Sequence, residues 1–233
     1  NITESMIRKI SNIGLPTGLQ MIFETGIFSA AIWISGVLGE NQLSANQIAL
    51  NLASMTFMVA NGLGITAMIR VGNQLGAKNY VNLRRVAFSV FLLVLCTQVF
   101  FAGLLALLRA WLPSLYLEMD NIEKAATNAA VISEAGNLLL IAAIFQISDG
   151  LQVTALGALR GVQDAKIPMV ITFIAYWLIA FPILCFLGLH TSLGTMGIWI
   201  GLLTGLTAAA ICLLYRFNHI SLRLIANRHK LPN

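Results

Sequence analysis

Two acidic side chains stand in the middle of apolar stretches of this 233-residue sequence. Glu24 lies eleven residues inside the stretch that begins at Ile13, and Asp149 lies ten residues before the end of another stretch at Leu159. At a helical rise of about 1.5 Å per residue, both lie about 15 Å deep, near the midplane of a hydrocarbon core about 30 Å thick. A carboxylate at that depth is costly and normally faces a protein or water cavity. The pair therefore predicts a site that binds Na⁺, with Glu24 and Asp149 as its metal ligands, or that carries H⁺.

Amide side chains accompany both acids. Gln20 lies one turn before Glu24, while Gln146 and Gln152 lie three residues to either side of Asp149 and share its helix face. The alternative is a pair of protonated core acids, with amides that only join neighbouring helices. The cost of burying two carboxyl groups at one depth favours the functional interpretation.

A second stretch repeats polar positions at spacings of four and three residues, which form one face of a helix over about 20 Å. A face of this kind does not point at lipid. It lines either a water-accessible cavity or a network of hydrogen bonds between helices. Its members are Gln47, Asn51, Ser54, Met58 and Asn61.

The composition excludes an ordinary soluble domain. Hydrophobic residues make up 58% of the chain and charged residues only 10%, whereas a soluble domain carries about 25% charged residues to cover its surface. The outside of the molecule must therefore face lipid. Because backbone polar groups in hydrocarbon need partners within their own segment, the spans are expected to be helices. The fold class is predicted as an all-α polytopic membrane protein, a bundle of six transmembrane helices.

The expected spans follow from apolar stretches of about 20 residues. A lead-in of residues 1–12 precedes a transmembrane unit of residues 13–215, and a basic tail of residues 216–233 follows it. The six spans cover residues 13–38, 45–69, 86–108, 135–159, 167–189 and 193–215.

Basic residues are distributed unevenly between the two sides of these spans. Twelve of the 14 Lys and Arg residues fall on the side that holds both termini, and only Arg109 and Lys124 fall on the other. Short loops rich in Lys and Arg stay in the cytoplasm, so both termini are predicted to be cytoplasmic. The bases are scattered anchors rather than the lining of a groove, which excludes a nucleic-acid partner. Membrane lipid is the expected surrounding.

No arrangement for covalent chemistry is present in the sequence. His190, His219 and His229 lie at or beyond the ends of spans, and the three cysteines lack metal-binding or disulfide spacing. A phosphate-binding loop of the type that binds ATP is also missing. The sequence therefore predicts a protein that is not an enzyme and that uses no cofactor.

Two packing features stand out in the last two spans. Pro182 falls in the middle of the fifth span and is expected to kink it. Gly197, Gly201 and Gly205 recur every fourth residue in the sixth span, a spacing that lets another helix approach closely.

Four segments together resemble the multidrug and toxic compound extrusion (MATE) family, over all six spans. They are Gly14–Pro16 with Glu24 in the same helix, Ala45–Asn51, Arg70–Ala77 and Gln146–Pro168. The match is to the C-terminal lobe of such a transporter. The chain begins at Asn1 without an initiator Met, and we expect it to be part of a longer protein.

The resemblance implies a transporter of twelve helices in two six-helix lobes, so the N-terminal lobe is an expected partner. It implies alternating access and export of bulky, often cationic and aromatic compounds, driven by Na⁺ or H⁺ as the coupling ion. It further implies that Glu24 and Asp149 form the coupling-ion site, with Gln47 near it. The expected location is the bacterial cytoplasmic (inner) membrane.

This sequence also departs from the family pattern. Asn46 and Ala165 stand where many relatives carry His and Thr. Some relatives place a tyrosine near the cation, whereas the aromatic residues expected beside the cavity here, Phe57 and Phe145, lack a hydroxyl group.

Two other functions remain as alternatives. A flippase for lipid precursors would share the fold, but its cavity would need several internal bases for pyrophosphate, and no span holds one. A membrane scaffold that does not transport would instead use the glycine positions of the sixth span to bind a partner.

Overall fold

The computed structural model describes residues 4–117 and 124–228. The ends of the predicted lead-in and tail, at residues 1–3 and 229–233, lie outside it. Every element within the described ranges is helical, which confirms the all-α prediction. The elements are α1 (Glu4–Leu38), α2 (Glu40–Gly76), α3 (Tyr80–Leu107), the 3-10 helix η1 (Leu112–Tyr116), α4 (Ala125–Gly161), α5 (Lys166–Phe173), the π-helix η3 (Ile174–Ala180), α6 (Phe181–Leu189) and α7 (Thr195–Arg228).

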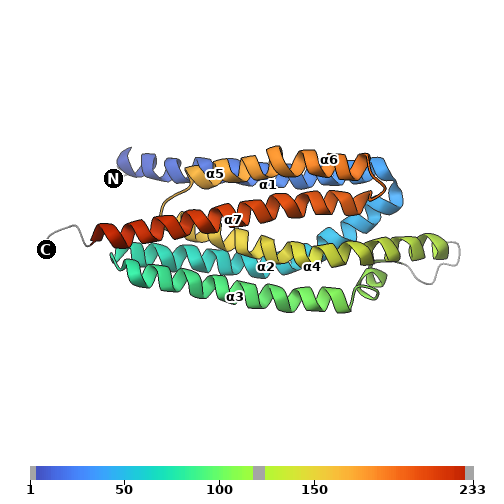
Figure 1. Ribbon diagram of the computed structural model, residues 1–233, viewed down its shortest axis with the longest axis horizontal. Helices are drawn as coiled ribbons and strands as arrows, with labels where there is room; N and C mark the ends of the chain where they lie inside the picture. The colour runs from blue at the N-terminus through green and yellow to red at the C-terminus, as the bar shows by residue number, and fades with distance from the viewer. Residues whose placement is uncertain (1–3, 118–123, 229–233) are drawn as a thin grey trace.

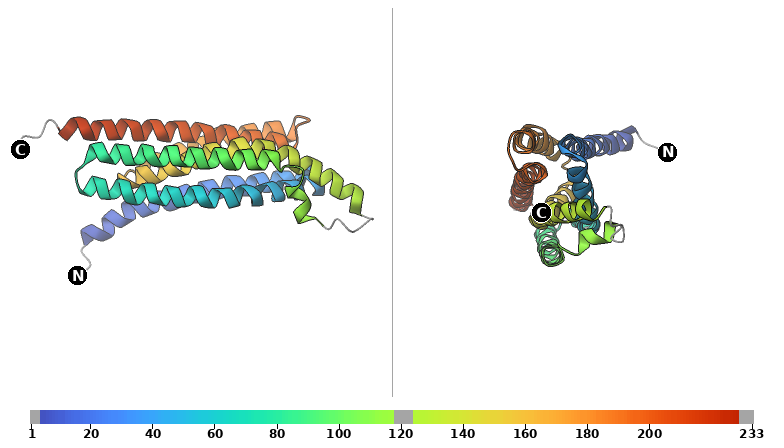
Figure 2. Two further views of the ribbon diagram at one scale, coloured as in Figure 1. Left: turned by 90° about the horizontal axis from the view of Figure 1, so that it is seen from below. Right: turned by 90° about the vertical axis from the view of Figure 1, so that its right-hand side faces the viewer.

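Six helical segments in this part of the chain are long and apolar enough to cross a membrane, with α5, η3 and α6 forming one of them. They lie roughly parallel in an elongated bundle (Figure 1). On one side α1 packs beside α5–η3–α6, on the other lie α2, α3 and α4, and α7 joins the two groups (Figures 1 and 2). The N-terminal part of α1 leans away from the bundle (Figure 2). Helix continues through residues 4–12 and 216–228, beyond the apolar stretches.

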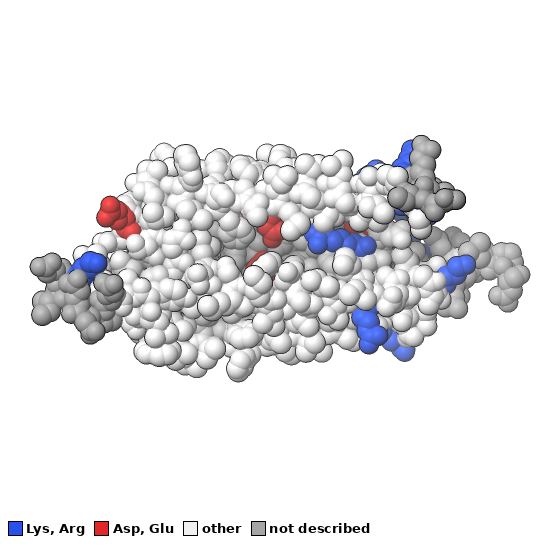
Figure 3. Space-filling model, turned by 180° about the vertical axis from the view of Figure 1, so that it is seen from behind, with Lys and Arg blue, Asp and Glu red and all other residues white. Residues whose placement is uncertain are grey.

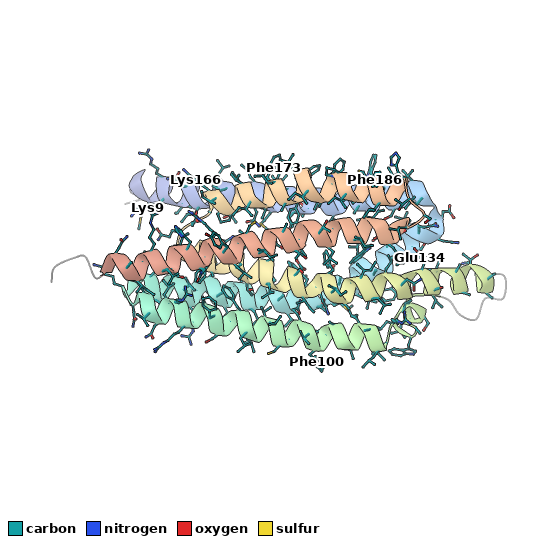
Figure 4. All side chains as sticks on the ribbon, in the orientation of Figure 1. Lys9, Phe100, Glu134, Lys166, Phe173 and Phe186 are labelled. Atoms are coloured by element: carbon teal, nitrogen blue, oxygen red, sulfur yellow. The ribbon has the colours of Figure 1, made fainter. Side chains whose placement is uncertain are left out.

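Apolar side chains cover much of the outside. Trp33, Phe100 and Phe186 are more than half exposed, and Phe100 and Phe186 project outward from the bundle (Figure 4). Lys9 and Lys166 lie at one end, whereas Glu134 lies toward the other. An apolar surface with charges near its ends matches a bundle that spans a bilayer.

Turns between the long helices depend on backbone conformations that favour glycine. Gly39, between α1 and α2, has φ of 138°, and Gly194, before α7, has φ of 54°. Side chains at these angles would strain the backbone. Each glycine therefore allows the chain to reverse within a few residues.

Close helix contacts hold the centre of the bundle together. A Cβ atom on Gly157 of α4 would collide with the carbonyl of Gly64 in α2, so the two backbones touch directly. In α7, a Cβ on Gly197 would lie 2.5 Å from the carbonyl oxygen of Leu187, and one on Gly201 would lie 2.5 Å from the backbone nitrogen of Leu184. A Cβ on Gly205 would meet Ala175 and Ala180 of η3, so the three glycine positions of the sixth span are filled by α6 and η3 of the same chain.

The buried core is divided into two apolar clusters, one toward each end of the bundle. Helix α4 contributes Phe145 and earlier residues to one cluster, and Ala155 and later residues to the other. Between them, residues 146–154 of α4 join neither cluster and include Gln146, Asp149 and Gln152. A polar layer thus crosses the bundle near its middle.

The fifth span changes helix type ahead of Pro182. Residues 174–180 form a π-helix, and Pro182 lies in the first turn of α6. Proline has no N–H to donate and its ring crowds the preceding turn, so the backbone hydrogen bonds there must rearrange. The sequence predicted a kink at Pro182, and what the structure shows ahead of it is a π-helical segment, a form that often marks functional sites.

Candidate functional site

Helices α1 and α4 bring the two predicted acids to one cavity of about 470 Å³. Asp149 is buried and Glu24 is half-buried, and the two carboxyl groups interact electrostatically. The face seen in Figure 3 carries acidic side chains midway along the molecule, with basic side chains beside them and further charged side chains toward both ends. The two acids that the sequence singled out thus line the same cavity. The residues that line the cavity are Met21, Glu24, Thr25, Phe28, Ile32, Gln47, Leu50, Asn51, Ala53, Ser54, Phe57, Phe145 and Asp149.

The polar stripe of α2 forms one wall of this cavity. Gln47, Asn51 and Ser54 line it and are exposed on the described chain. The Tyr116 hydroxyl donates to Oδ1 of Asn51 at 3.1 Å, and the Ser54 hydroxyl donates to the backbone carbonyl of Leu50 at 2.7 Å. Among the described residues, the amide group of Gln47 has no such fixed partner, and it lines the cavity.

Two residues of the same stripe lie away from the cavity. Met58 is 69% exposed and, like the half-buried Asn61, does not line it. The stripe therefore contributes only its first three members, together with Phe57. The spacing alone could not show where along α2 the cavity would end.

Aromatic rings form the opposite wall. Phe28 and Phe145 meet edge to face with ring centroids 6.0 Å apart, and Phe145 also contacts Trp199 at 5.2 Å. The Trp199 indole N–H donates to Oδ1 of the buried Asn46 at 2.8 Å, which fixes the ring behind the cavity. Rings next to carboxylates suit organic cations, because ring faces and acids both attract positive charge.

Gln20 and Gln152 lie on the far side of the acids from the cavity. Neither lines the cavity, yet both side chains approach the Glu24 carboxyl group. The amide nitrogens of both residues and the amide oxygen of Gln152 are buried without a hydrogen-bond partner in the described structure. Both amides are therefore placed to interact with the Glu24 carboxyl group rather than with the cavity.

Gln146 does not line the cavity, contrary to expectation. Its side chain points at α3, where its amide nitrogen donates to the backbone carbonyl of Gln98 at 3.3 Å. In return, the side-chain amide nitrogen of Gln98 donates to the backbone carbonyl of Gln146 at 2.9 Å. Gln146 therefore joins two helices. Residues three apart on a helix point in similar but not identical directions. The spacing from Asp149 therefore did not show that Gln146 faces α3 while Asp149 faces the cavity.

Arg160 was missed by the sequence analysis, which counted it among the bases outside the spans. It lies in the last turn of α4, and its Nη2 donates to Oε1 of Gln20 at 2.9 Å. The guanidinium group also attracts the Glu24 carboxylate. The sequence did offer one indication of this contact, because an arginine side chain is long enough to reach across more than one helical turn.

Tyr176 was missed as well. It lies in η3, is buried, and its hydroxyl has no hydrogen-bond partner in the described structure. It interacts electrostatically with Glu24 and Asp149 and lies near Gln152. The sequence pointed only to Phe57 and Phe145 as aromatic residues beside the cavity, and this hydroxyl group is an addition to them.

The packing of α1 against the fifth span fixes the position of Tyr176 along the bundle axis. The Trp177 indole N–H donates to the carbonyl of Phe23 at 3.3 Å, and the Phe23 and Phe173 rings lie 4.9 Å apart. A Cβ on Gly26 would lie 3.0 Å from the Trp177 ring, so the helices are in close contact there. These contacts hold residues 173–177 level with Glu24.

No group of three or more His, Cys, Asp or Glu side chains that could hold a metal ion occurs among the described residues. The oxygen atoms that line the cavity belong to the two carboxyl groups and to neutral amide and hydroxyl groups. Such oxygen donors suit hard cations such as Na⁺ rather than transition metals.

Comparison with known proteins identifies the family. The MatE family model matches residues 16–186. The chain is 38% identical over 221 residues to a protein named "Probable multidrug resistance protein NorM" of Xylella fastidiosa, covering 94% of this chain and 45% of that protein. It is 39% identical to "Multidrug resistance protein NorM" of Burkholderia vietnamiensis and 38% identical to "Multidrug resistance protein PmpM" of Pseudomonas aeruginosa, covering 95% and 94% of this chain and 47% and 45% of those proteins. The chain thus spans about half the length of these curated relatives.

Solved structures show the same fold. A structure described as "MATE in the bent conformation" matches with a TM-score of 0.86 at 14% identity, over 97% of this chain and 48% of that one. The "eukaryotic MATE transporter AtDTX14" matches with a TM-score of 0.80 at 20% identity, over 96% and 50%. The expectation that the chain is not an enzyme agrees with these names. The chain is a six-helix, multi-pass membrane protein that belongs to the MatE family.

Proposed function

We propose that this bundle is one half of a cation-coupled antiporter that exports organic compounds by alternating access. The observation that carries the proposal is the convergence of Glu24 and Asp149, from two helices, on one aromatic-walled cavity. The multidrug resistance names of the relatives support the transport of small organic molecules. Na⁺ or H⁺ is the coupling ion, because a pair of buried carboxylates suits either.

The mechanism is a competition for the acids. An organic cation in the cavity contacts the aromatic wall and is attracted by the carboxylates. A Na⁺ or H⁺ that reaches Glu24 and Asp149 neutralises that attraction and releases the compound. The two ligands shift the conformational equilibrium only by their different affinities for its two states.

A second six-helix lobe completes the transporter. The matched solved structures are about twice as long as this chain, and the polar wall of α2 is exposed on it. Polar groups facing lipid cost free energy, so another protein surface covers this wall. The basic end is cytoplasmic, in the bacterial inner membrane, because positive loops stay inside.

The two alternatives lose support from the packing. Among the described residues, Arg160 is the base that approaches the acids, and a flippase cavity would need several. The glycine positions of α7 contact α6 and η3 of the same chain, so they are not free for a partner of a scaffold.

The test uses the complete transporter that contains this chain, in proteoliposomes loaded with a fluorescent cationic dye. We expect Glu24→Gln and Asp149→Asn each to lower Na⁺- or H⁺-driven efflux at least about tenfold, because a neutral group no longer exchanges a cation for the substrate. Glu40→Gln is the matched control, since Glu40 is exposed in the first turn of α2 and distant from the cavity lining. Full efflux by both site variants would overturn the proposal.

A further inference from the structure

Arg160 approaches the acid pair from the side opposite the cavity. The cavity is lined by Glu24 and Asp149 but not by Arg160 or Gln20. The guanidinium donates through Nη2 to Gln20 at 2.9 Å and attracts Glu24, which lies one turn further along α1. The acids therefore separate an open cavity from a fixed positive charge.

The guanidinium group is not fully satisfied where it lies. Its Nε is buried and has no hydrogen-bond partner in the described structure, and Gln20 accepts from only one of its nitrogens. By contrast, Arg216 donates through Nε to Asp164 at 2.9 Å and Arg84 donates to Ser221 at 2.9 Å. An incompletely paired, half-buried guanidinium interacts more strongly with a nearby charge than a solvated one does.

We propose that Arg160 is an internal counter-ion of Glu24 that competes with the coupling cation. This inference rests on the proposed function and adds a regulatory residue to the same site. With the acids empty, Arg160 offsets the negative charge that burial makes costly. When a cation binds from the cavity, the like charge of Arg160 repels it, which limits the affinity and lets the cation leave again.

The position of Arg160 also gives the site a direction. Arg160 lies toward the end of the bundle that carries most of the bases, beyond the acids as seen from the cavity. A fixed positive charge in a narrow, partly buried region is a barrier to cations. A cation at the acids is therefore prevented from slipping through the bundle without the conformational change that moves substrate.

The experiment compares Arg160→Gln with Arg160→Lys and with Arg70→Gln in the complete transporter. Arg70 is exposed in α2, so its variant removes the same charge away from the site. Two quantities are measured in proteoliposomes: the cation concentration for half-maximal dye efflux, and the flux of ²²Na⁺ in the absence of dye. For a proton-coupled transporter the second measurement uses a pH-sensitive dye instead.

We expect R160Q to lower the half-maximal cation concentration about tenfold and to raise the substrate-free cation flux, because a like charge that repels the cation has been removed. R160K should restore both values to near those of the unmodified protein, and R70Q should leave them unchanged. An unchanged or higher half-maximal concentration in a folded R160Q protein would overturn the inference.

A second variant guards against loss of folding. Gln20→Leu removes the amide that accepts from Arg160 and leaves Glu24 as its partner, so the half-maximal concentration should rise about threefold. If R160Q does not reach the membrane, an unchanged or lower value in Gln20→Leu overturns the inference. An unmodified protein that shows no cation-driven efflux at all would instead overturn the proposed function.

Discussion

The hydroxyl of Tyr176 is the side-chain group whose role is easiest to isolate. It is buried beside Glu24, Asp149 and Gln152 without a hydrogen-bond partner in the described structure. A phenol oxygen in that position would supply a neutral ligand to a cation at the proposed site. The substitution Tyr176→Phe removes the hydroxyl and hardly changes the volume of the side chain. An effect on cation dependence can therefore be separated from an effect on packing.

We expect Tyr176→Phe to raise the half-maximal cation concentration about tenfold, because one oxygen ligand costs roughly as much as a hydrogen bond to a charged group. The maximal efflux rate and the unfolding temperature should stay the same. Tyr215→Phe is the control, since Tyr215 is 72% exposed on α7. Equal cation dependence in both variants would show that the Tyr176 hydroxyl is not a ligand.

The sequence predicted the acids of the site better than their partners. Glu24 and Asp149 were identifiable because charges are rare in apolar spans and their depth follows from counting residues. Arg160 was not, because it lies at a helix end and only its side chain reaches back to Gln20. Tyr176 was not, because the regular helical spacing fails within the π-helix η3.

Helix packing in α7 depends on the absence of side chains at three positions. A Cβ on Gly201 would lie 2.5 Å from the backbone nitrogen of Leu184, and that backbone has no rotamer with which to move aside. Helices α6 and α7 would have to separate. Because α6 continues from the π-helix that carries Tyr176, such a shift would also reach the site.

We therefore expect Gly201→Ala to destabilise the protein by about 2 kcal/mol, the usual cost of overpacking a tight contact. Gly103→Ala should be neutral or slightly stabilising, because a Cβ there meets nothing within 4 Å and alanine favours helix. The unfolding temperature in detergent, measured with a thiol-reactive or intrinsic fluorophore, distinguishes the two. A stable Gly201→Ala protein would contradict the close contact.

The number and type of the helices followed directly from hydropathy, whereas their limits did not. Apolar residues mark only the part of a helix that lies in hydrocarbon, and both α1 and α7 continue well past it. The interruption of the fifth span was signalled by Pro182, yet the π-helical form of residues 174–180 depends on packing against α1 and α7. Local sequence does not contain that information.

The bundle as a whole has one basic end, which includes the turn between α2 and α3, the start of α5 and the end of α7. Lys9 and Lys166 lie there, and Glu134 lies toward the opposite end (Figure 4). This asymmetry predicts a single orientation in the membrane. The proposed direction of export depends on that orientation.

Cysteine labelling checks the orientation. In a protein whose Cys96, Cys185 and Cys212 are replaced by Ala, we expect Asn82→Cys to react with a membrane-impermeant maleimide only in inside-out vesicles. Ser192→Cys should react only in right-side-out cells or spheroplasts, because it lies in the turn before α7 at the other end. Both positions are exposed, so lack of access is not a reason for failure. The reverse pattern would place the basic end outside.

The uncovered polar wall of α2 has a further consequence for biogenesis. Helices leave the insertion machinery sideways into lipid, where Gln47, Asn51 and Ser54 would meet hydrocarbon until the proposed second lobe covers them. An exposed wall therefore indicates a bundle that has not yet assembled with the proposed second lobe. A bundle synthesised without its partner would keep this signal exposed, and membrane chaperones and quality-control proteases that recognise polar groups within the bilayer would have a ready means of removing it.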